Sequence, residues 1–274
     1  MSLNIINFES QYLHGNTTVS IILPDKPADL APKNFYQNSK KYKVLWLLHG
    51  TCGDHSDWVR KTNIELYACE KDLVVVMPSS LNSDYSNWDG FMLGYSMFDY
   101  LTEELMPLIY GWFPVSDRRE DNFIAGLSMG GHSAVKCAIN HPEKFAAVAD
   151  LSGPVKDLRA IYAQPFDSLP RRLINRANNG GGVEAYLNSY ENSWEKLAAL
   201  VGKNVLPRLY FASGTKDYMY DHYLQFKKYA GEIGLDATFE EIEDYQHEWR
   251  FWDITIQHAL AFFGLKDRSP LHSQ

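Results

Sequence analysis

Ser128 lies between two glycines in the stretch Gly126-Leu127-Ser128-Met129-Gly130, where an apolar run gives way to small residues. A serine in the pattern Gly-x-Ser-x-Gly, placed between a strand and a helix, is typical of a tight turn that exposes a nucleophilic hydroxyl. The glycines leave room for neighbouring backbone because they carry no side chain. The pattern alone is weak, but its strand-to-helix context makes it specific. We therefore predict that Ser128 is a catalytic nucleophile.

A serine hydroxyl needs a base that takes its proton, and the base needs a third group that fixes its orientation. In this context the acid and then the histidine follow the serine along the chain. His247, in the stretch EDYQHEWRFW, occupies the expected loop between the last strand and the last helix. Three other histidines fall inside predicted helices and are expected to be surface or packing residues: His132, His222 and His258. We predict that His247 is the base.

Serine, histidine and an acid form a catalytic triad. Its histidine follows one strand of the sheet, and the acid is expected in the loop after the strand directly before that one. Asp217, in SGTKDYMY, occupies this loop. Asp221 lies one helical turn later. An acidic side chain near a helix N-terminus is favourable, and this is sufficient to explain an aspartate at that position. Asp150, at the end of the preceding apolar run, is a second candidate for the same role. We predict Asp217 as the acid.

Acyl transfer also needs donors for the oxyanion that develops on the substrate. One donor is expected to be the backbone N–H of Met129, directly after the nucleophile. The second is expected from the loop after an earlier strand, and VLWLLHGTCGD supplies a His-Gly turn there. We predict the N–H of Thr51 as this second donor.

His49, Cys52 and His55 are spaced by three residues, a pattern that raises the question of a metal site. A fourth ligand is missing, and the loop already has an explanation in the oxyanion donor. We therefore predict no metal site there, and the acyl-transfer mechanism requires no organic cofactor.

Strand-length apolar runs alternate with stretches of helical period. The runs lie at 17–24, 43–50, 72–80, 121–128, 145–153, 207–214 and 236–244, and the expected helices at 57–69, 96–110, 129–140, 218–233 and 248–263. Alternating strands and helices form right-handed βαβ units in one sheet. Several runs are apolar almost throughout, as expected for strands covered on both faces. The sequence predicts an α/β fold with a mostly parallel central sheet and helices on both faces.

Two segments depart from this alternation of strands and helices. The stretch 24–41 is rich in Pro, Lys and Asn and is predicted to be a surface loop. The span 155–204 is polar, contains NNGGG and holds only short helices. We predict that it is a cap-like insertion over the top of the sheet, within a single domain that spans 1–274.

The formal net charge of −8 argues against nucleic acid or an anionic membrane surface as a partner and favours a neutral or cationic small ligand. The three cysteines form no Cys-x-x-Cys pair, which fits a reducing compartment rather than a disulfide framework. The first residues lack the pattern of a signal peptide, and no apolar stretch is long enough to span a membrane. These features predict a cytoplasmic protein.

Five motifs together resemble the esterase D and tributyrin esterase group of α/β-hydrolases: LLHGTCGDHSDW, EELMP, GLSMGG, SGTKD and HEWRFWD. The resemblance runs over about residues 44–263, with the motifs in the family's order. It implies an α/β-hydrolase fold and a carboxylesterase for short acyl chains. Ser128, Asp217 and His247 match the family's triad, and Thr51 and Met129 match its oxyanion donors. Enzymes of this group are often oligomeric, so a homo-oligomer is among the expectations.

The resemblance leaves several substrates open. The S-formylglutathione hydrolase branch usually shows a cysteine- and proline-bearing segment after its first helix region and a different pattern in place of His-Gly-x-x-Gly. This sequence departs from that branch in both features, which favours the tributyrin esterase side of the group. Feruloyl and acetyl-xylan esterases are also similar, so a plant cell-wall ester stays open. An acyltransferase has the same constellation of residues, and a non-catalytic binding module is marked by loss of a triad residue, which the sequence does not show.

Aromatic residues are candidates for the wall of an acyl or aryl pocket, although such residues more often pack in a core. They are Trp88, Phe91, Tyr95 and Phe98, with Tyr162, Phe166 and Trp194 from the insertion. Trp88 is the one we name as a candidate substrate contact. The insertion has no long apolar stripe, which argues against a lipase acting at an oil surface.

Overall fold

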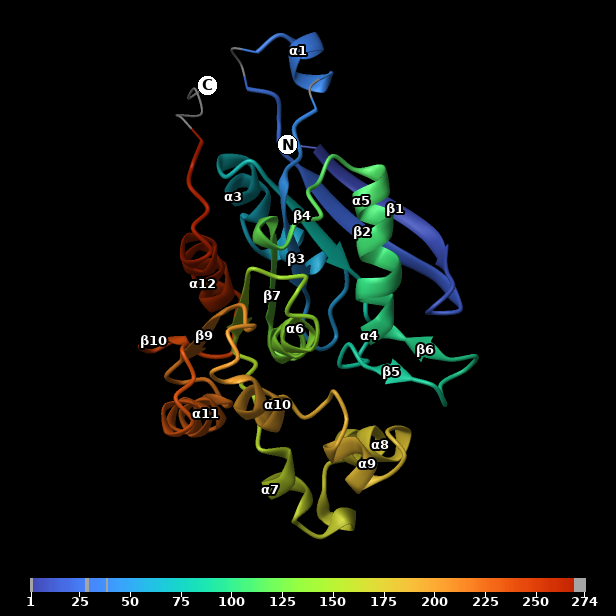
Figure 1. The fold of residues 1–274 in the computed structure, drawn as a ribbon, viewed down its shortest axis with the longest axis vertical. Helices are drawn as coiled ribbons and strands as arrows, with labels where there is room; N and C mark the ends of the chain where they lie inside the picture. Colours follow the sequence, from blue (N-terminus) through green and yellow to red (C-terminus); the bar gives the residue numbers. More distant parts are fainter. Residues whose placement is uncertain (1, 28–29, 38, 269–274) are drawn as a thin grey trace.

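The central sheet is mostly parallel and runs through the middle of the molecule (Figure 1). The computed structural model describes residues 2–27, 30–37 and 39–268. Within these residues, eight strands form the sheet in the order β1-β2-β4-β3-β7-β8-β9-β10. Their bounds are β1 (Ser2–Ser10), β2 (Gly15–Leu23), β3 (Lys43–Leu48), β4 (Leu73–Pro78), β7 (Asn122–Leu127), β8 (Ala147–Leu151), β9 (Arg208–Gly214) and β10 (Thr238–Ile242). In this sheet, the strands β4, β3, β7, β8, β9 and β10 are parallel, while β2 pairs antiparallel with both β1 and β4.

The central strands are buried on both faces, which explains why their sequences are apolar almost throughout. In β3, the side chains of Val44, Trp46 and Leu48 join one apolar cluster, and Leu45 and Leu47 join the cluster on the opposite face. The sheet therefore separates two hydrophobic layers, and the predicted α/β fold is confirmed.

Helices cover each face. One layer contains α6 (Met129–Asn140), α10 (Ser193–Leu200), α11 (Tyr220–Glu232) and the run of α4 (Met97–Asp99), a π-helix (Tyr100–Leu105) and α5 (Met106–Trp112). The other contains α2 (Asp57–Lys61), α3 (Ile64–Glu70) and α12 (Trp249–Phe262). The helix predicted at 57–69 is thus two helices, because Thr62 leaves the helical conformation with φ −139° and ψ 175°.

Two N-terminal features differ from the expectations. The strand β1 was not among the predicted strands. The predicted loop at 24–41 contains a short helix, α1 (Pro32–Tyr36), which begins with a proline at a position where the missing N–H costs no helical hydrogen bond. Residues 28, 29 and 38 of that loop lie outside the described residues.

The segment between β8 and β9 carries four α-helices in its described course and extends past the carboxyl ends of the strands, at the end of the molecule opposite α1 (Figure 1). These are α7 (Leu158–Tyr162), α8 (Arg171–Asn179), α9 (Val183–Leu187) and α10. Part of the segment has a small apolar cluster of its own, which includes Leu158, Ala177 and Tyr186. The remaining small hairpin pairs β5 (Asn87–Trp88) with β6 (Tyr95–Ser96).

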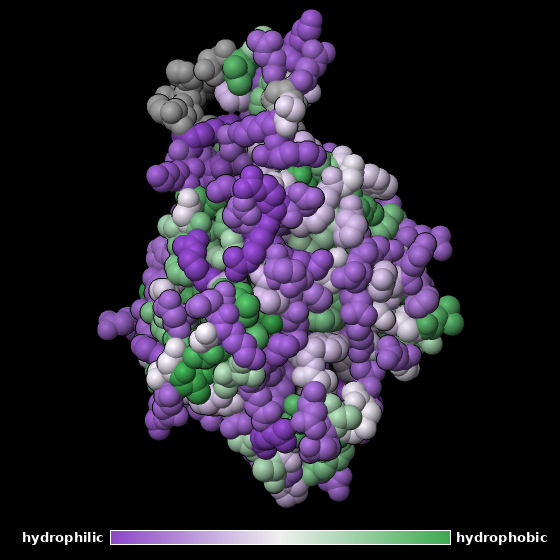
Figure 2. Space-filling view, in the orientation of Figure 1, coloured by the Kyte–Doolittle hydropathy of each residue, from purple (hydrophilic) through white to green (hydrophobic). Residues whose placement is uncertain are grey.

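Polar residues cover most of the face seen in Figure 2, with apolar side chains in scattered groups. Among the described residues, every helix is too short or too polar to cross a bilayer.

Candidate active site

Ser128 occupies the turn between β7 and α6 with φ 52° and ψ −117°, a conformation that a non-glycine residue rarely adopts. Its N–H donates to the carbonyl of Leu151 at 2.8 Å. A Cβ on Gly126 would lie 2.4 Å from the backbone of Gly130, and a Cβ on Gly130 would lie 2.6 Å from the carbonyl oxygen of Leu48. Both flanking positions therefore require glycine, and the turn holds the serine at the carboxyl end of the sheet.

His247 lies in the loop between β10 and α12. Its Nε2 is 2.9 Å from the hydroxyl oxygen of Ser128. The imidazole contacts the ring of Tyr218, at 4.7 Å between centroids, and the ring of Trp252, at 5.0 Å and nearly perpendicular. These two rings restrict the orientation of the imidazole.

Asp217 lies in the loop after β9 and is buried. Its Oδ2 accepts a hydrogen bond from Nδ1 of His247 at 2.8 Å, and its Oδ1 accepts one from the N–H of Met219 at 2.8 Å. With its proton on Nδ1, the imidazole presents an unprotonated Nε2 to the serine hydroxyl. The arrangement can therefore remove the serine proton.

Asp150, the second candidate for the acid, has a different environment. Its Oδ1 accepts from the N–H of Gly153 at 2.7 Å, and its buried Oδ2 has no hydrogen-bond partner among the described residues. Burial, together with the nearby charge of Asp217, raises the pKa of Asp150 well above its ordinary value. The carboxyl that contacts His247 is that of Asp217.

Thr51 and Met129 line the same cavity as Ser128. Within the described chain, neither backbone N–H donates a hydrogen bond, so both are free to bind a ligand oxygen. Met129 is the first residue of α6, where the helix dipole favours negative charge. The hydroxyl of Thr51 accepts a hydrogen bond from Nη1 of Arg172 at 3.2 Å, which ties this loop to the insertion.

The cavity beside Ser128 has a volume of about 300 Å³. The insertion supplies much of its wall, including Leu158, Leu173, Lys156 and Arg172. The structure does not bring Trp88 to this cavity. Instead, Trp88 lines a neighbouring one, and its Nε1 donates to the carbonyl of Ser83 at 2.7 Å.

Among the described residues that line the cavity, none is one of the aromatic residues considered in the sequence. Phe98 stacks on Tyr190 and Trp194 stacks on Tyr229, so these two rings pack within the protein. Tyr218, which was not considered in the sequence, contributes its phenol ring to the cavity wall.

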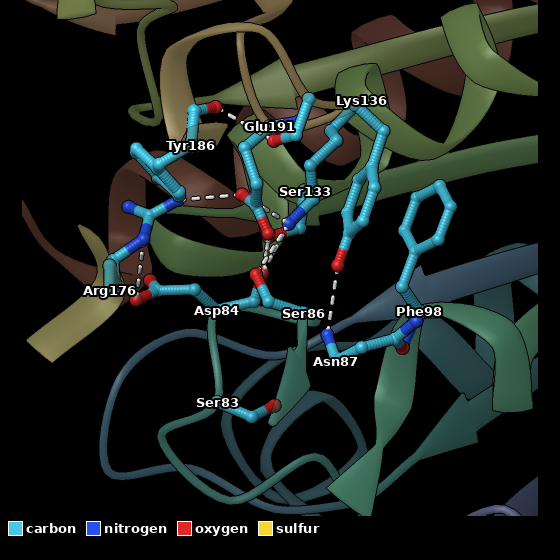
Figure 3. Close-up of polar contacts among 12 residues, drawn as sticks. Ser83, Asp84, Ser86, Asn87, Phe98, Ser133, Lys136, Arg176, Tyr186 and Glu191 are labelled. Carbon is cyan, nitrogen blue, oxygen red and sulfur yellow. Dashed lines mark hydrogen bonds and ion pairs between the residues drawn. The ribbon is translucent and has the colours of Figure 1, made fainter. Parts of the chain in front are cut away.

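The charged groups of the wall were not predicted from the sequence. Asp84, from the loop after β4, accepts hydrogen bonds from two guanidinium nitrogens of Arg172, and Nε of Arg176 lies 3.6 Å from it. Glu191 contacts Arg176 at 2.9 Å and Lys136 of α6 at 3.1 Å. Figure 3 shows Asp84, Arg176, Glu191 and Lys136 converging, so charges from the insertion and from the sheet domain meet at one place.

These contacts keep the two carboxylates ionised. Although burial raises the pKa of each, Lys136 and Arg176 lower the pKa of Glu191 to about 2. In the same way, Arg176 and Arg172 hold the pKa of Asp84 well below its ordinary value. The cluster is therefore charged at neutral pH.

The histidines considered for a metal site have other partners. The ring of His49 contacts the carbonyl oxygen of Gly50 at 2.7 Å through Nδ1 and Ser80 through Nε2. His55 contacts the hydroxyl of Ser20 at 2.7 Å. His132, expected to be a packing or surface residue, lines the cavity beside Ser128.

Comparison with known proteins points to one family. The model of a family described as "Putative esterase" matches residues 10–263. An acetyl esterase of Caldicellulosiruptor saccharolyticus is 29% identical over an alignment that covers 96% of this chain and 98% of that protein.

Two solved structures from Staphylococcus aureus are also similar, each with 27% identity over 96% of this chain and 98% of the other. One is the fluorophosphonate-binding serine hydrolase FphF with substrate bound, with a TM-score of 0.80. The other is the S-formylglutathione hydrolase FrmB without ligand, with a TM-score of 0.79.

Proposed function

The chain belongs to the putative esterase family, and we propose that Ser128, His247 and Asp217 are the catalytic residues of its carboxylic ester hydrolysis. The observation that carries the proposal is the pair of hydrogen bonds through the imidazole, 2.9 Å to Ser128 and 2.8 Å to Asp217. The serine hydrolase and esterase relatives support the same reaction class.

In this mechanism His247 takes the proton of Ser128 as its oxygen attacks the ester carbonyl carbon. Asp217 holds the imidazolium through Nδ1, and the N–H groups of Thr51 and Met129 donate to the oxyanion. His247 then gives its proton to the leaving alcohol, which departs and leaves an acyl group on Ser128. A water molecule repeats the sequence on the acyl-enzyme and releases the acid.

We propose short acyl esters as the substrates. A cavity of about 300 Å³ is at the small end of ligand pockets and fits a small ester. The insertion at 155–204 acts as a cap in this proposal, because its side chains supply much of the wall of the cavity beside Ser128. The acetyl esterase among the relatives supports the same acyl size, and the S-formylglutathione hydrolase among them keeps that thioester in the test panel.

The test is a series of p-nitrophenyl esters of increasing acyl length, with methyl ferulate and S-formylglutathione added. We expect kcat/KM to be highest from acetyl to butyryl and to be lost in Ser128→Ala. The matched control is Ser168→Ala, an exposed serine of the insertion, which keeps wild-type activity. Undiminished turnover by Ser128→Ala would remove the nucleophile, and a preference for long acyl chains would overturn the substrate class.

We also propose the cytoplasm as the compartment. Cys52, Cys69 and Cys137 are all free thiols, and a reducing compartment keeps them so. A homo-oligomer, which the family resemblance implies, is tested by light scattering of the purified chain.

A further inference from the structure

The cavity beside Ser128 carries more positive than negative charge. Its charged wall residues are Lys156, Arg172, Arg176, Asp84 and Glu191. Each of the two carboxylates contacts two cations. Asp84 contacts Arg172 and Arg176. Glu191 contacts Arg176 and also Lys136, which does not line the cavity. This local excess runs against the net charge of −8 of the whole chain. The cavity is therefore a positive site in an acidic protein.

Lys156 is the cation that has no partner. Its ammonium makes no hydrogen bond or ion pair with any residue in the ranges 2–27, 30–37 and 39–268, although the side chain is half-buried. Burial and the nearby charges of Arg176 and Arg172 lower its pKa and are only partly offset by the charge of Asp84, so the two arginines repel the ammonium. A half-buried cation among cations is costly unless an anion joins it.

Two further donors face the same cavity. Arg172 uses three of its five N–H groups on Asp84 and Thr51, and its side chain is 43% exposed, so the others are open to a ligand. The buried Nε2 of His132 has no partner among the described residues. Burial, Arg176 and other charges lower the pKa of His132 to about 3, so it is neutral and able to donate one proton from Nε2 or Nδ1.

From this convergence we infer that Lys156 and Arg172 bind a carboxylate carried by the ester, so that the favoured substrates are anionic esters. The inference rests on the proposed function, because it concerns the substrate of the Ser128 site. It replaces the expectation of a neutral or cationic ligand, which was drawn from the charge of the whole chain. The wall of the cavity, and not the average surface, contacts the substrate.

The first experiment compares three acetyl esters that differ in the charge of the leaving group. They are p-acetoxybenzoate, its neutral methyl ester, and p-(trimethylammonio)phenyl acetate. We expect kcat/KM to fall in that order after correction for the hydroxide-catalysed rate of each ester. A second pair, methyl hydrogen glutarate and methyl pentanoate, places the carboxylate on the acyl side. Preference for the anion in either set supports the inference, and preference in neither overturns it.

The second experiment removes the charge. Lys156→Met lowers the ratio of kcat/KM for the anionic ester to that for its neutral counterpart by about 10-fold, the size expected for one charged hydrogen bond. Lys156→Glu lowers the ratio further and raises the relative rate of the cationic ester. The matched control is Lys203→Met, which removes an exposed lysine outside the cavity and keeps the wild-type ratio.

The outcomes separate the two proposals. Equal ratios in wild type, Lys156→Met and Lys156→Glu would overturn the anion site while leaving the esterase mechanism intact. Absence of turnover of every ester by the folded wild-type protein would contradict the proposed function and the anion site with it. Higher ionic strength is expected to lower kcat/KM for the anionic ester more than for the neutral one.

Discussion

Nε2 of His247 lies 2.9 Å from the hydroxyl oxygen of Ser128, although the two residues are 119 positions apart in the chain. The parallel sheet produces this contact, because the loops after β7 and β10 both leave its carboxyl edge. Any variant that moves one of these loops changes the contact.

Asp217→Asn is expected to lower kcat by about 10⁴-fold, because an amide at this position no longer fixes the imidazole tautomer that leaves Nε2 unprotonated. The measurement is hydrolysis of p-nitrophenyl acetate at saturating substrate. Asp150→Asn is the matched control, since Asp150 does not touch His247. It is expected to stay within a few-fold of wild type. The reverse result would assign the role of acid to Asp150.

Asp150→Asn is also expected to change how stability depends on pH. The raised pKa of Asp150 means that its contribution to stability is complete below the unfolded pKa and is lost as the pH rises toward the folded pKa. Asparagine has no such dependence. The free energy of unfolding of Asp150→Asn relative to wild type therefore rises as the pH increases above the unfolded pKa of about 3.9, by up to about 1.4 kcal/mol per pH unit. Urea unfolding across this range measures the difference, and parallel curves for the two proteins would show that Asp150 is ionised in the fold.

Gly130→Ala is expected to destabilise the protein by about 2 kcal/mol or more and to abolish activity, because the new Cβ would collide with backbone oxygen atoms of β3 and the loop after it. Gly111→Ala is the control. Gly111 lies in α5 with open space around its Cα, so alanine there stabilises by about 0.5 to 1 kcal/mol. Wild-type activity in Gly130→Ala would show that the turn is looser than the structure has it.

Glu191→Gln is expected to lower the free energy of unfolding by about 3 kcal/mol, because Lys136 and Arg176 would lose a buried partner. Glu195→Gln is the comparison, since Glu195 pairs with Arg159 in solvent and its loss is expected to lower the free energy of unfolding far less. Equal losses for the two variants would contradict the importance assigned to the buried cluster.

The same carboxylate gives an acid-dependent term. Because the pKa of Glu191 is lowered to about 2, its contribution is present above the unfolded pKa of about 4.3 and is lost as the pH falls toward 2. Glu191→Gln should lack this part of the acid-induced loss.

Several elements could be predicted from the sequence because local patterns determine them. The helix after Ser128 has the predicted bounds of residues 129 and 140, since the glycine-flanked turn at Ser128 precedes it and a short loop follows. The strands β3, β4, β7 and β8 could be predicted because strands that are buried on both faces are apolar almost throughout. The expected order of serine, acid and histidine along the chain selected His247 from the nine histidines.

Other features depend on tertiary contacts that a local pattern does not contain. The strand β1 is an edge strand whose Leu3 and Ile5 are exposed, so its sequence lacks the usual alternation of buried apolar and exposed polar residues. Lys156 and Arg172 lie in a polar insertion without a clear period, and only the folded chain brings them to the serine. Conversely, Trp88 was a candidate substrate contact in the sequence. In the fold, its indole donates a hydrogen bond to the carbonyl of Ser83 and lines another cavity.

The most direct measurement is the mass of the intact protein after brief mixing with p-nitrophenyl acetate and quenching in acid, followed by peptide mapping. The account predicts one acetyl group on Ser128 in the wild type and longer-lived acetylation in His247→Gln once it has formed, because water then lacks its base. An acetyl group found on another residue, or steady hydrolysis with unchanged kcat by Ser128→Ala, would contradict the account.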